Sequence, residues 1–253
     1  MGDAMRIFVD VGAHNGETLH VALHPKWGFD RIFALEPASA CQKWLLGFRD
    51  PRLSVEPFGL GSASGKVSLH GAGLLGASIY EDKRQKAVSQ ERISTEEIEL
   101  VRATDWFRSN VSRHAEVFLK LNCEGSEADI LDDLLDSGCA EQIRSIYVDF
   151  DIRKVPSQAH RQQEVEERLR QAGVDYVTPD ELGCNGHFAV AKWLSQAISP
   201  VSYGFADRLR YALRLYAPPY ERLTELSSAV LPKTLLFWLG RRFGRVARSR
   251  RQT

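Results

Sequence analysis

The sequence predicts an α/β fold: a doubly wound, mostly parallel sheet, followed by a helical, basic C-terminal extension. Short apolar runs alternate with segments of helical spacing over residues 5–195, which is typical of consecutive βαβ units. With 43% hydrophobic and 26% charged residues among 253, the composition is that of a globular protein, and it excludes a disordered or collagen-like chain. We therefore expect a main domain at 1–195 and an extension at 196–253.

Each predicted element follows from local spacing. Residues 6–11 are apolar and β-branched, residues 12–16 carry two glycines, and residues 17–23 have helical spacing, which together predict strand, turn and helix. The same reasoning predicts strands at 31–35, 53–58, 117–121, 145–150, 174–178 and 187–193, a hairpin arm at 66–70, and helices at 38–48, 157–172 and up to Gly138. Residues 81–100 are polar, and we expect a loop with a helical turn or two.

The extension differs from the main domain in charge. Residues 201–253 contain 11 Lys or Arg against 3 Asp or Glu, although the whole chain has 33 of each. Residues 231–251 also carry an apolar stripe and Trp238, so they predict a basic amphipathic helix that contacts an anionic membrane. A helix docked on the protein's own core or on a dimer partner explains the pattern equally well. We do not expect a nucleic-acid partner, since aromatic platforms and a recognised binding module are lacking.

The location of the protein is predicted from its apolar runs. None approaches the ~18 residues that a membrane span needs, and Asp3 and Arg6 interrupt the N-terminus where a signal peptide needs its apolar region. We expect a cytoplasmic protein, held at the inner face of the membrane if the extension docks there. The four cysteines lack zinc-ligand spacing, so we expect them to be reduced and buried, and we expect no metal site.

The ends of the first two strands predict a ligand site, because ligands of open α/β sheets bind beyond the carboxyl ends of strands. Gly12 and Gly16 allow a sharp turn close to a ligand, and Asp10 leaves a carboxylate that suits an ammonium group. Glu36 stands where a carboxylate can accept both hydrogen bonds of a ribose diol. Both common glycine-rich phosphate loops are absent. This combination fits S-adenosylmethionine, which joins an amino acid to an adenosine without a phosphate.

Several segments resemble the FkbM family of S-adenosylmethionine-dependent methyltransferases. The most specific is Phe118–Glu127, which is similar to the family block Lys-Ile-Asp-Val-Glu-Gly-Ala-Glu. The others are residues 8–18, 34–37 and 59–67 and Ser78. The resemblance covers roughly residues 5–192 and leaves the extension outside. It implies a class I methyltransferase fold, which is Rossmann-like.

The resemblance also implies an activity: transfer of a methyl group to a hydroxyl on a sugar, a glycoside or a related natural-product or glycolipid acceptor. Two residues depart from the family pattern, because Asn122 replaces its usual Asp and His14 stands where Asn is common. Asn122 removes a carboxylate from a strand end that faces the transferable methyl group. This keeps open the alternative of an N- or carboxyl-methyltransferase. A second alternative, of another class, is a degenerate cofactor-binding scaffold tethered by its basic tail. The chain can also form an oligomer.

The candidate site residues follow from the turn, the second strand end and the family block. The expected cofactor-binding residues are Asp10, Gly12, Ala13, Asn15, Gly16, Thr18, Glu36, Pro37 and Asn122. The expected catalytic residues are Glu124, Asn122 and Asp149. Glu124 matches the family block, although a carboxylate that caps a helix start explains it nearly as well. Asp151, His14 and His187 are further candidates for a base. Lys120 also matches the block and is expected to pair with Glu124 or to touch the cofactor.

Overall fold

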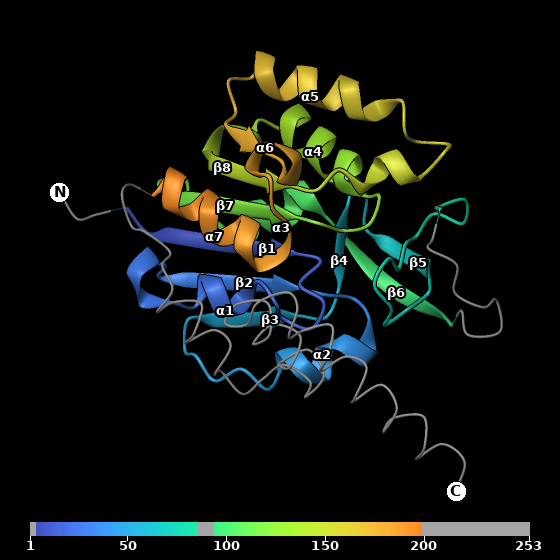
Figure 1. The fold of residues 1–253 in the computed structure, drawn as a ribbon, viewed down its shortest axis with the longest axis horizontal. Coiled ribbons are helices and arrows are strands. Elements are labelled where there is room, and N and C mark those ends of the chain that lie inside the picture. Colours follow the sequence, from blue (N-terminus) through green and yellow to red (C-terminus); the bar gives the residue numbers. More distant parts are fainter. Residues whose placement is uncertain (1–3, 85–93, 199–253) are drawn as a thin grey trace, which may run out of the picture. The chain divides into compact units, whose positions relative to one another are not determined.

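A six-stranded sheet forms the centre of the computed structural model, which describes residues 4–84 and 94–198 (Figure 1). The strands run in the order β3-β2-β1-β7-β8-β9, and all neighbours are parallel. Their bounds are Arg6–Val11 (β1), Arg31–Leu35 (β2), Leu53–Glu56 (β3), Glu116–Leu121 (β7), Ile143–Val148 (β8) and Tyr176–Val177 (β9). The predicted parallel α/β fold is confirmed. The predicted membrane-contacting segment at 231–251 lies outside the described residues.

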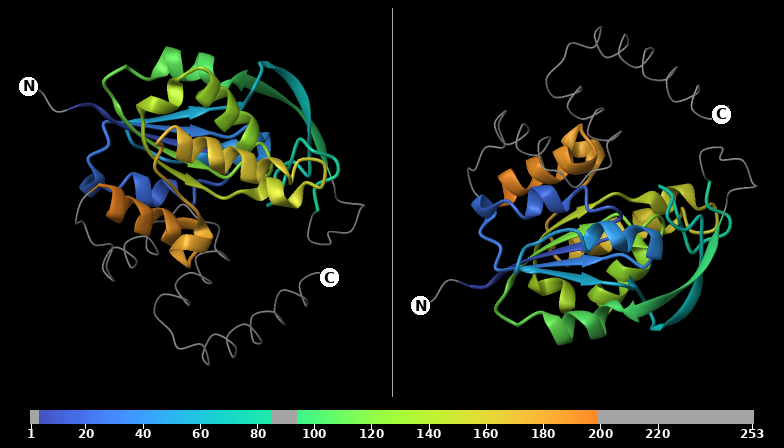
Figure 2. Two further views of the ribbon diagram at one scale, coloured as in Figure 1. Left: turned by 90° about the horizontal axis from the view of Figure 1, so that it is seen from above. Right: turned by 90° about the horizontal axis from the view of Figure 1, so that it is seen from below.

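Helices cover both faces of the sheet, as a doubly wound fold requires (Figure 2). Helices α1 and α7 pack together on one face, α3 and α4 cover the other, and α5 packs beside α4. The helix bounds are Leu19–Ala22 (α1), Ser39–Leu45 (α2), Ala103–Asn110 (α3), Glu127–Asp136 (α4), Arg161–Gln171 (α5), Pro179–Leu182 (α6) and Gly186–Ala197 (α7). Short 3-10 helices lie at Pro25–Trp27 (η1), Cys139–Gln142 (η3) and Asp151–Lys154 (η4).

Two predicted elements are wrong. Residues 187–193, predicted as a strand, belong to helix α7, where His187, Val190 and Leu194 are buried at helical spacing. A short continuous apolar run fits a buried strand and a buried helix equally well, so its periodicity could not distinguish the two. Residues 81–100 were predicted as a loop, but strand β6 (Thr95–Arg102) begins within them. In this strand charged side chains flank the buried Ile98, so the sequence looked like a polar loop and the strand was not recognised.

Strand β6 is the centre of a second, three-stranded sheet. It pairs parallel with β4 (Gly59–Gly61) and antiparallel with β5 (Gly65–His70). One face of this sheet buries Leu69 and Ile98 against Ala38 and Cys41, which lie at the start of α2. The small sheet therefore stands beside the carboxyl end of β2, where a ligand was predicted.

Alternation along the central strands decides which side chains reach each face. Val9 and Leu119 pack in the main core with α3 and α4, whereas Phe8 and Phe118 contact Trp193 of α7. Because the side-chain period of a strand is 2, Asp10 and Lys120 follow Phe8 and Phe118 on the α7 side. Two charged groups are thus buried next to each other at the carboxyl ends of neighbouring strands.

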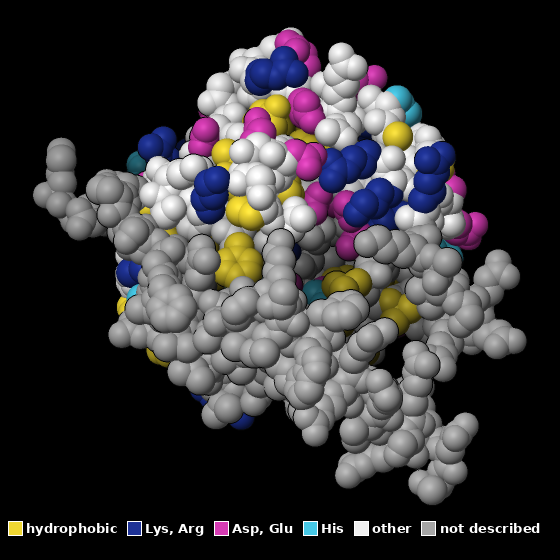
Figure 3. Space-filling view, in the orientation of Figure 1, with side chains coloured by type: hydrophobic (Ala, Val, Ile, Leu, Met, Phe, Trp, Pro, Cys, Tyr) yellow, Lys and Arg dark blue, Asp and Glu magenta, His cyan; other side chains and the backbone are white. Residues whose placement is uncertain are grey.

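Ion pairs hold α5 against α4. The pairs are Arg161 with Asp129 and Asp132, and Arg168 with Asp132 and Asp136. Side chains of both charge signs are interspersed over the upper part of the face in Figure 3, which agrees with this pairing. The network fixes the position of the helix that follows η4, and η4 borders the candidate site.

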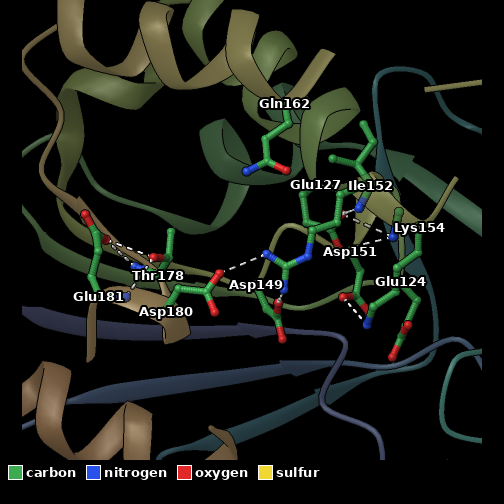
Figure 4. Close-up of polar contacts among 12 residues, drawn as sticks. Glu124, Glu127, Asp149, Asp151, Ile152, Lys154, Gln162, Thr178, Asp180 and Glu181 are labelled. Atoms are coloured by element: carbon green, nitrogen blue, oxygen red, sulfur yellow. Dashed lines mark hydrogen bonds and ion pairs between the residues drawn. The ribbon is translucent and has the colours of Figure 1, made fainter. Parts of the chain in front are cut away.

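Glu127, the first residue of α4, shapes the loop after β7. Its side chain is fully buried, and its carboxylate accepts hydrogen bonds from the backbone N–H groups of Cys123 (3.0 Å), Gly125 (3.1 Å) and Ile152 (3.1 Å). Ile152 lies in η4, after β8, so one carboxylate joins the loops that follow two neighbouring strands (Figure 4). These contacts position Glu124, which lies between the first two donors.

We expect Glu127→Ala to destabilise the fold by about 3 kcal/mol or more, because each buried donor left without a partner costs roughly 1–3 kcal/mol. Chemical denaturation measures this loss. The matched control is Glu141→Ala, which removes an exposed carboxylate and should change the free energy of unfolding by less than about 0.5 kcal/mol. Equal stability of the two variants would contradict the role given to Glu127.

Candidate functional site

A cavity of ≈ 160 Å³ opens at the carboxyl ends of β1, β2 and β7. Most of its lining comes from four parts of the chain. They are the turn after β1 (Gly12, Ala13, His14, Glu17, Thr18), the end of β2 (Glu36, Pro37), the end of β7 (Asn122, Cys123, Glu124) and the small sheet with its connection (Leu60, Leu69, Gly73–Ala77, Ile98, Leu100). The polar residues come mainly from the strand ends, whereas the small sheet contributes an apolar wall.

Gly12 is required by close backbone contact. It has φ +76°, and a Cβ atom there would lie 2.0 Å from the backbone oxygen of Asn122. The Asn122 N–H also donates to the Val11 oxygen (3.2 Å). The turn and the end of β7 therefore form one continuous backbone wall. Gly16, by contrast, packs against the ring of Phe48, 2.6 Å from where its Cβ would stand, and does not line the cavity.

Asp10 lies behind this wall rather than in the cavity. It is fully buried, and its Oδ1 is 2.8 Å from the Lys120 ammonium. Thr18 donates its hydroxyl hydrogen to the other oxygen of Asp10, and Lys120 also donates to the Gly12 oxygen (2.7 Å). The expected pairing of Lys120 with Glu124 is therefore wrong, because Lys120 pairs with Asp10. Asp10 therefore supports Lys120 and Thr18, which do line the cavity.

Glu36 directly follows β2 and lines the cavity, and both of its carboxylate oxygens accept hydrogen bonds from backbone N–H groups. One accepts a hydrogen bond from the His14 N–H (2.9 Å), and the other from the Ala38 N–H (2.8 Å). Burial raises the pKa of Glu36, against the opposing effect of these two donors. Each carboxylate oxygen can accept a second hydrogen bond. The side chain is thus fixed in place with acceptor capacity to spare.

Asn122 presents a polar atom that nothing in the described ranges 4–84 and 94–198 satisfies. Its Oδ1 is buried and has no hydrogen-bond partner among these residues. Buried amide oxygens without a partner are rare in native proteins, so a ligand is the natural partner for this one. The His14 ring lines the same cavity, and burial together with the nearby Lys120 charge lowers its pKa.

Glu124 lines the cavity and belongs to a cluster of charges (Figure 4). Its φ of +60° is unusual for a residue with a side chain, and such strain is often found at functional sites. Its carboxylate contacts the Lys83 ammonium and the Asp151 carboxyl group. Burial and Asp151 raise the pKa of Glu124, and Lys83 opposes this rise.

The remaining candidates lie away from the cavity lining. Asp149 faces Arg153 (3.5 Å), and Arg153 also pairs with Asp180 (3.2 Å), so the three residues form a separate surface group. Asn15 is likewise not part of the lining. His187 does not stand in a strand but at the start of α7, where its Nδ1 lies 2.9 Å from Glu17 at the cavity rim.

Sequence reasoning missed Lys83 and the role of Glu127. Lys83 comes from a polar segment without periodicity, so no local pattern marked it. Glu127 was inside the family block but was not assigned a role. The four cysteines are free, as expected, but only Cys41 and Cys139 are buried.

The comparison with known families agrees with this geometry. A family model described as the methyltransferase FkbM domain matches residues 10–176. No curated protein and no solved structure matches the chain. Among the described helices, none is long and apolar enough to cross a membrane. The family match includes the turn at Gly12, Glu36 and the block that ends at Glu127, and it spans well over half of the sequence. The chain therefore belongs to the FkbM family of methyltransferases.

Proposed function

We propose that this chain is an S-adenosylmethionine-dependent O-methyltransferase that binds its cofactor in the cavity at the ends of β1, β2 and β7. The observation that carries the proposal is the convergence of three groups on this cavity. They are the backbone turn at Gly12, the Glu36 carboxylate and the Asn122 Oδ1 atom, which has no partner among the described residues. Each suits a different part of a cofactor that joins an amino acid to a nucleoside.

The residues present fit such a cofactor. Glu36 would accept the hydrogen bonds of the ribose diol. Its carboxylate is held in place by two backbone N–H groups, and each oxygen can still accept a second hydrogen bond. Asn122 Oδ1 would accept from the ammonium group of the amino-acid part, which would satisfy its buried oxygen. The apolar wall of the small sheet, including Leu60 and Leu100, would suit the adenine ring.

When bound, S-adenosylmethionine supplies a methyl group on a positively charged sulfur. The task left to the protein is to hold an acceptor hydroxyl in line and to remove its proton, since alignment and exclusion of water provide much of the rate. Glu124 is placed for the second task. Glu124 is one of the residues that line the cavity, and its raised pKa makes its carboxylate a better proton acceptor than an exposed one.

The proposed acceptor is a hydroxyl on a sugar, a glycoside or a glycolipid. The family resemblance suggests this class, and a positioned carboxylate base supports a hydroxyl over an amine, because a neutral amine can attack without prior loss of a proton. An N- or carboxyl-methyltransferase would not depend on Glu124 in this way. A scaffold with a degenerate site would bind the cofactor but would never convert it to S-adenosylhomocysteine.

Incubation of the purified protein with methyl-labelled cofactor and fractionated cell extract tests the proposal. We expect label in a methyl ether, formed on a hydroxyl oxygen of the acceptor, together with S-adenosylhomocysteine. Label on nitrogen or on a carboxylate would overturn the O-methyl assignment. Binding without turnover in every fraction would support a scaffold instead.

Glu36→Gln should weaken S-adenosylhomocysteine binding tenfold or more, because a hydrogen bond to a charged group is worth about 1.5–3 kcal/mol. Calorimetry measures the change. Glu99→Gln is the matched control, since it alters an exposed carboxylate on β6 that does not line the cavity. If both variants bind as the unmodified protein does, the ribose site is not at Glu36.

Glu124→Gln should lower the rate of methyl transfer by about 10²-fold or more, which is the usual contribution of a general base, and leave S-adenosylhomocysteine affinity nearly unchanged. In the unmodified protein, the rate should fall at acid pH when Glu124 becomes protonated. Because burial and Asp151 raise its pKa, this fall should begin at a higher pH than for an exposed glutamate. A rate that is independent of pH on the acid side and insensitive to Glu124→Gln would exclude the base.

A further inference from the structure

Lys83 is a buried cation beside the candidate base. Its side chain is 2% exposed, and its ammonium contacts the Glu124 carboxylate. It also lies 3.8 Å from Asp151 Oδ2 and donates to the Gly76 oxygen (3.4 Å). A buried ammonium is costly unless it is paired. The surroundings of Lys83 therefore favour a fixed position between two carboxylates.

The segment that carries Lys83 is anchored independently of Glu124. The Tyr80 hydroxyl donates to Asp129 of α4 (2.5 Å), and Asp82 accepts from the Ser157 N–H (2.8 Å). The Arg84 N–H donates to the Lys154 oxygen of η4 (2.8 Å). These contacts hold the backbone on both sides of Lys83, so its ammonium is brought to Glu124 by the fold and does not depend on that one contact.

The same segment also holds the backbone of Glu124. The Ser78 hydroxyl is buried and donates to the Glu124 carbonyl oxygen (2.8 Å). Glu124 has left-handed φ, so its conformation needs support from its surroundings. Ser78 supplies a contact to the main chain and Lys83 a contact to the side chain. Residues 78–84 therefore fix both the backbone and the carboxylate of the candidate base.

The charges around Glu124 oppose one another. The titratable groups that face Glu124 or its partner Asp151 come from every neighbouring element: Lys83, Cys123, Glu127, Asp149, Asp151 and Lys154. Burial and the Asp151 charge favour a protonated Glu124, whereas Lys83 favours the ionised form. Lys154 contacts the other oxygen of Asp151 and is half exposed. Without Lys83, two carboxyl groups would share one buried site, and one of them would hold a proton.

We propose that Lys83 is a positioning residue for Glu124: it holds the carboxylate at the cavity wall and keeps it ionised against Asp151. The proposal rests on the proposed function in one respect, because it gives Glu124 the role of base. Removal of the positive charge should then make Glu124 harder to ionise, and removal of the Asp151 charge should make it easier. A purely structural role for the cluster predicts no such opposite effects.

The ionisation of Glu124 can be measured without any methyl transfer. Protein labelled with carboxyl-¹³C glutamate is titrated by NMR, and the Glu124 signal is assigned by its loss in Glu124→Gln. We expect Lys83→Met to raise the titration midpoint by about 1 pH unit or more. Asp151→Asn should lower the midpoint, and Lys83→Arg should leave it close to that of the unmodified protein. A midpoint that does not move in Lys83→Met would overturn the proposal.

Lys83→Met leaves two carboxylates buried together and can fail to fold. In that case, Asp151→Asn is compared with the double variant Lys83→Met/Asp151→Asn, which loses one charge of each sign. A higher midpoint in the double variant than in Asp151→Asn isolates the effect of Lys83. Equal midpoints in these two variants would overturn the proposal in the same way.

The pH dependence of methyl transfer to the labelled acceptor fraction then tests the role of Lys83 separately from the role of Glu124 as base. The acid limb of the rate should move up in Lys83→Met and down in Asp151→Asn, while S-adenosylhomocysteine affinity changes less than about threefold. If the NMR midpoints move as expected but the rate does not depend on Glu124, the role of Lys83 stands and the assignment of the base is wrong. If the rate depends on Glu124 and the midpoints do not move, the base stands and Lys83 has no positioning role.

Discussion

The buried ion pair of Asp10 and Lys120 is the interaction on which the site depends. It joins β1 and β7, the neighbouring strands where the order of the sheet reverses, and ligands of such sheets bind at this point. Lys120 also donates to the oxygen of Gly12, so the same cation fixes the turn above the pair. Loss of one partner would leave a buried charge unpaired, which typically costs about 3–5 kcal/mol. The pair thus stabilises the carboxyl ends of β1 and β7 and also fixes the shape of the cavity wall.

Charged groups of this kind recur along the carboxyl edge of the sheet, and each one fixes a loop. Glu36 holds the turn after β1 through the His14 N–H, and Glu127 holds the loops after β7 and β8 through three N–H groups. Lys83 adds a cation from the connection between β5 and β6 of the small sheet. Because these loops are held by buried charges rather than by exposed contacts, the cavity is largely preformed, which limits the cost of ordering when a ligand binds.

The sequence was sufficient to predict the fold and the strand ends that form the cavity, because both depend on local patterns. Gly12, Glu36 and Glu124 were identified from a glycine turn, a spacing and a family block. The direction in which Asp10 points could not be predicted, since its partner Lys120 is far away in the sequence and only strand pairing brings the two together. Lys83 was missed because it lies in a polar segment without periodicity, which carries no local pattern. The error at α7 had another cause, because an apolar run without polar interruption does not reveal its period.

A crystal structure with S-adenosylhomocysteine tests most directly the claim that Asp10 supports the cavity from behind while Glu36 and Asn122 face the ligand. We expect both ribose hydroxyls within hydrogen-bonding distance of Glu36, about 2.7–3.0 Å, with the Asp10–Lys120 pair intact beneath the turn. We also expect a ligand partner for Asn122 Oδ1. A ligand whose ammonium group binds Asp10 and displaces Lys120, or a ligand bound outside this cavity, would contradict the supporting role of Asp10.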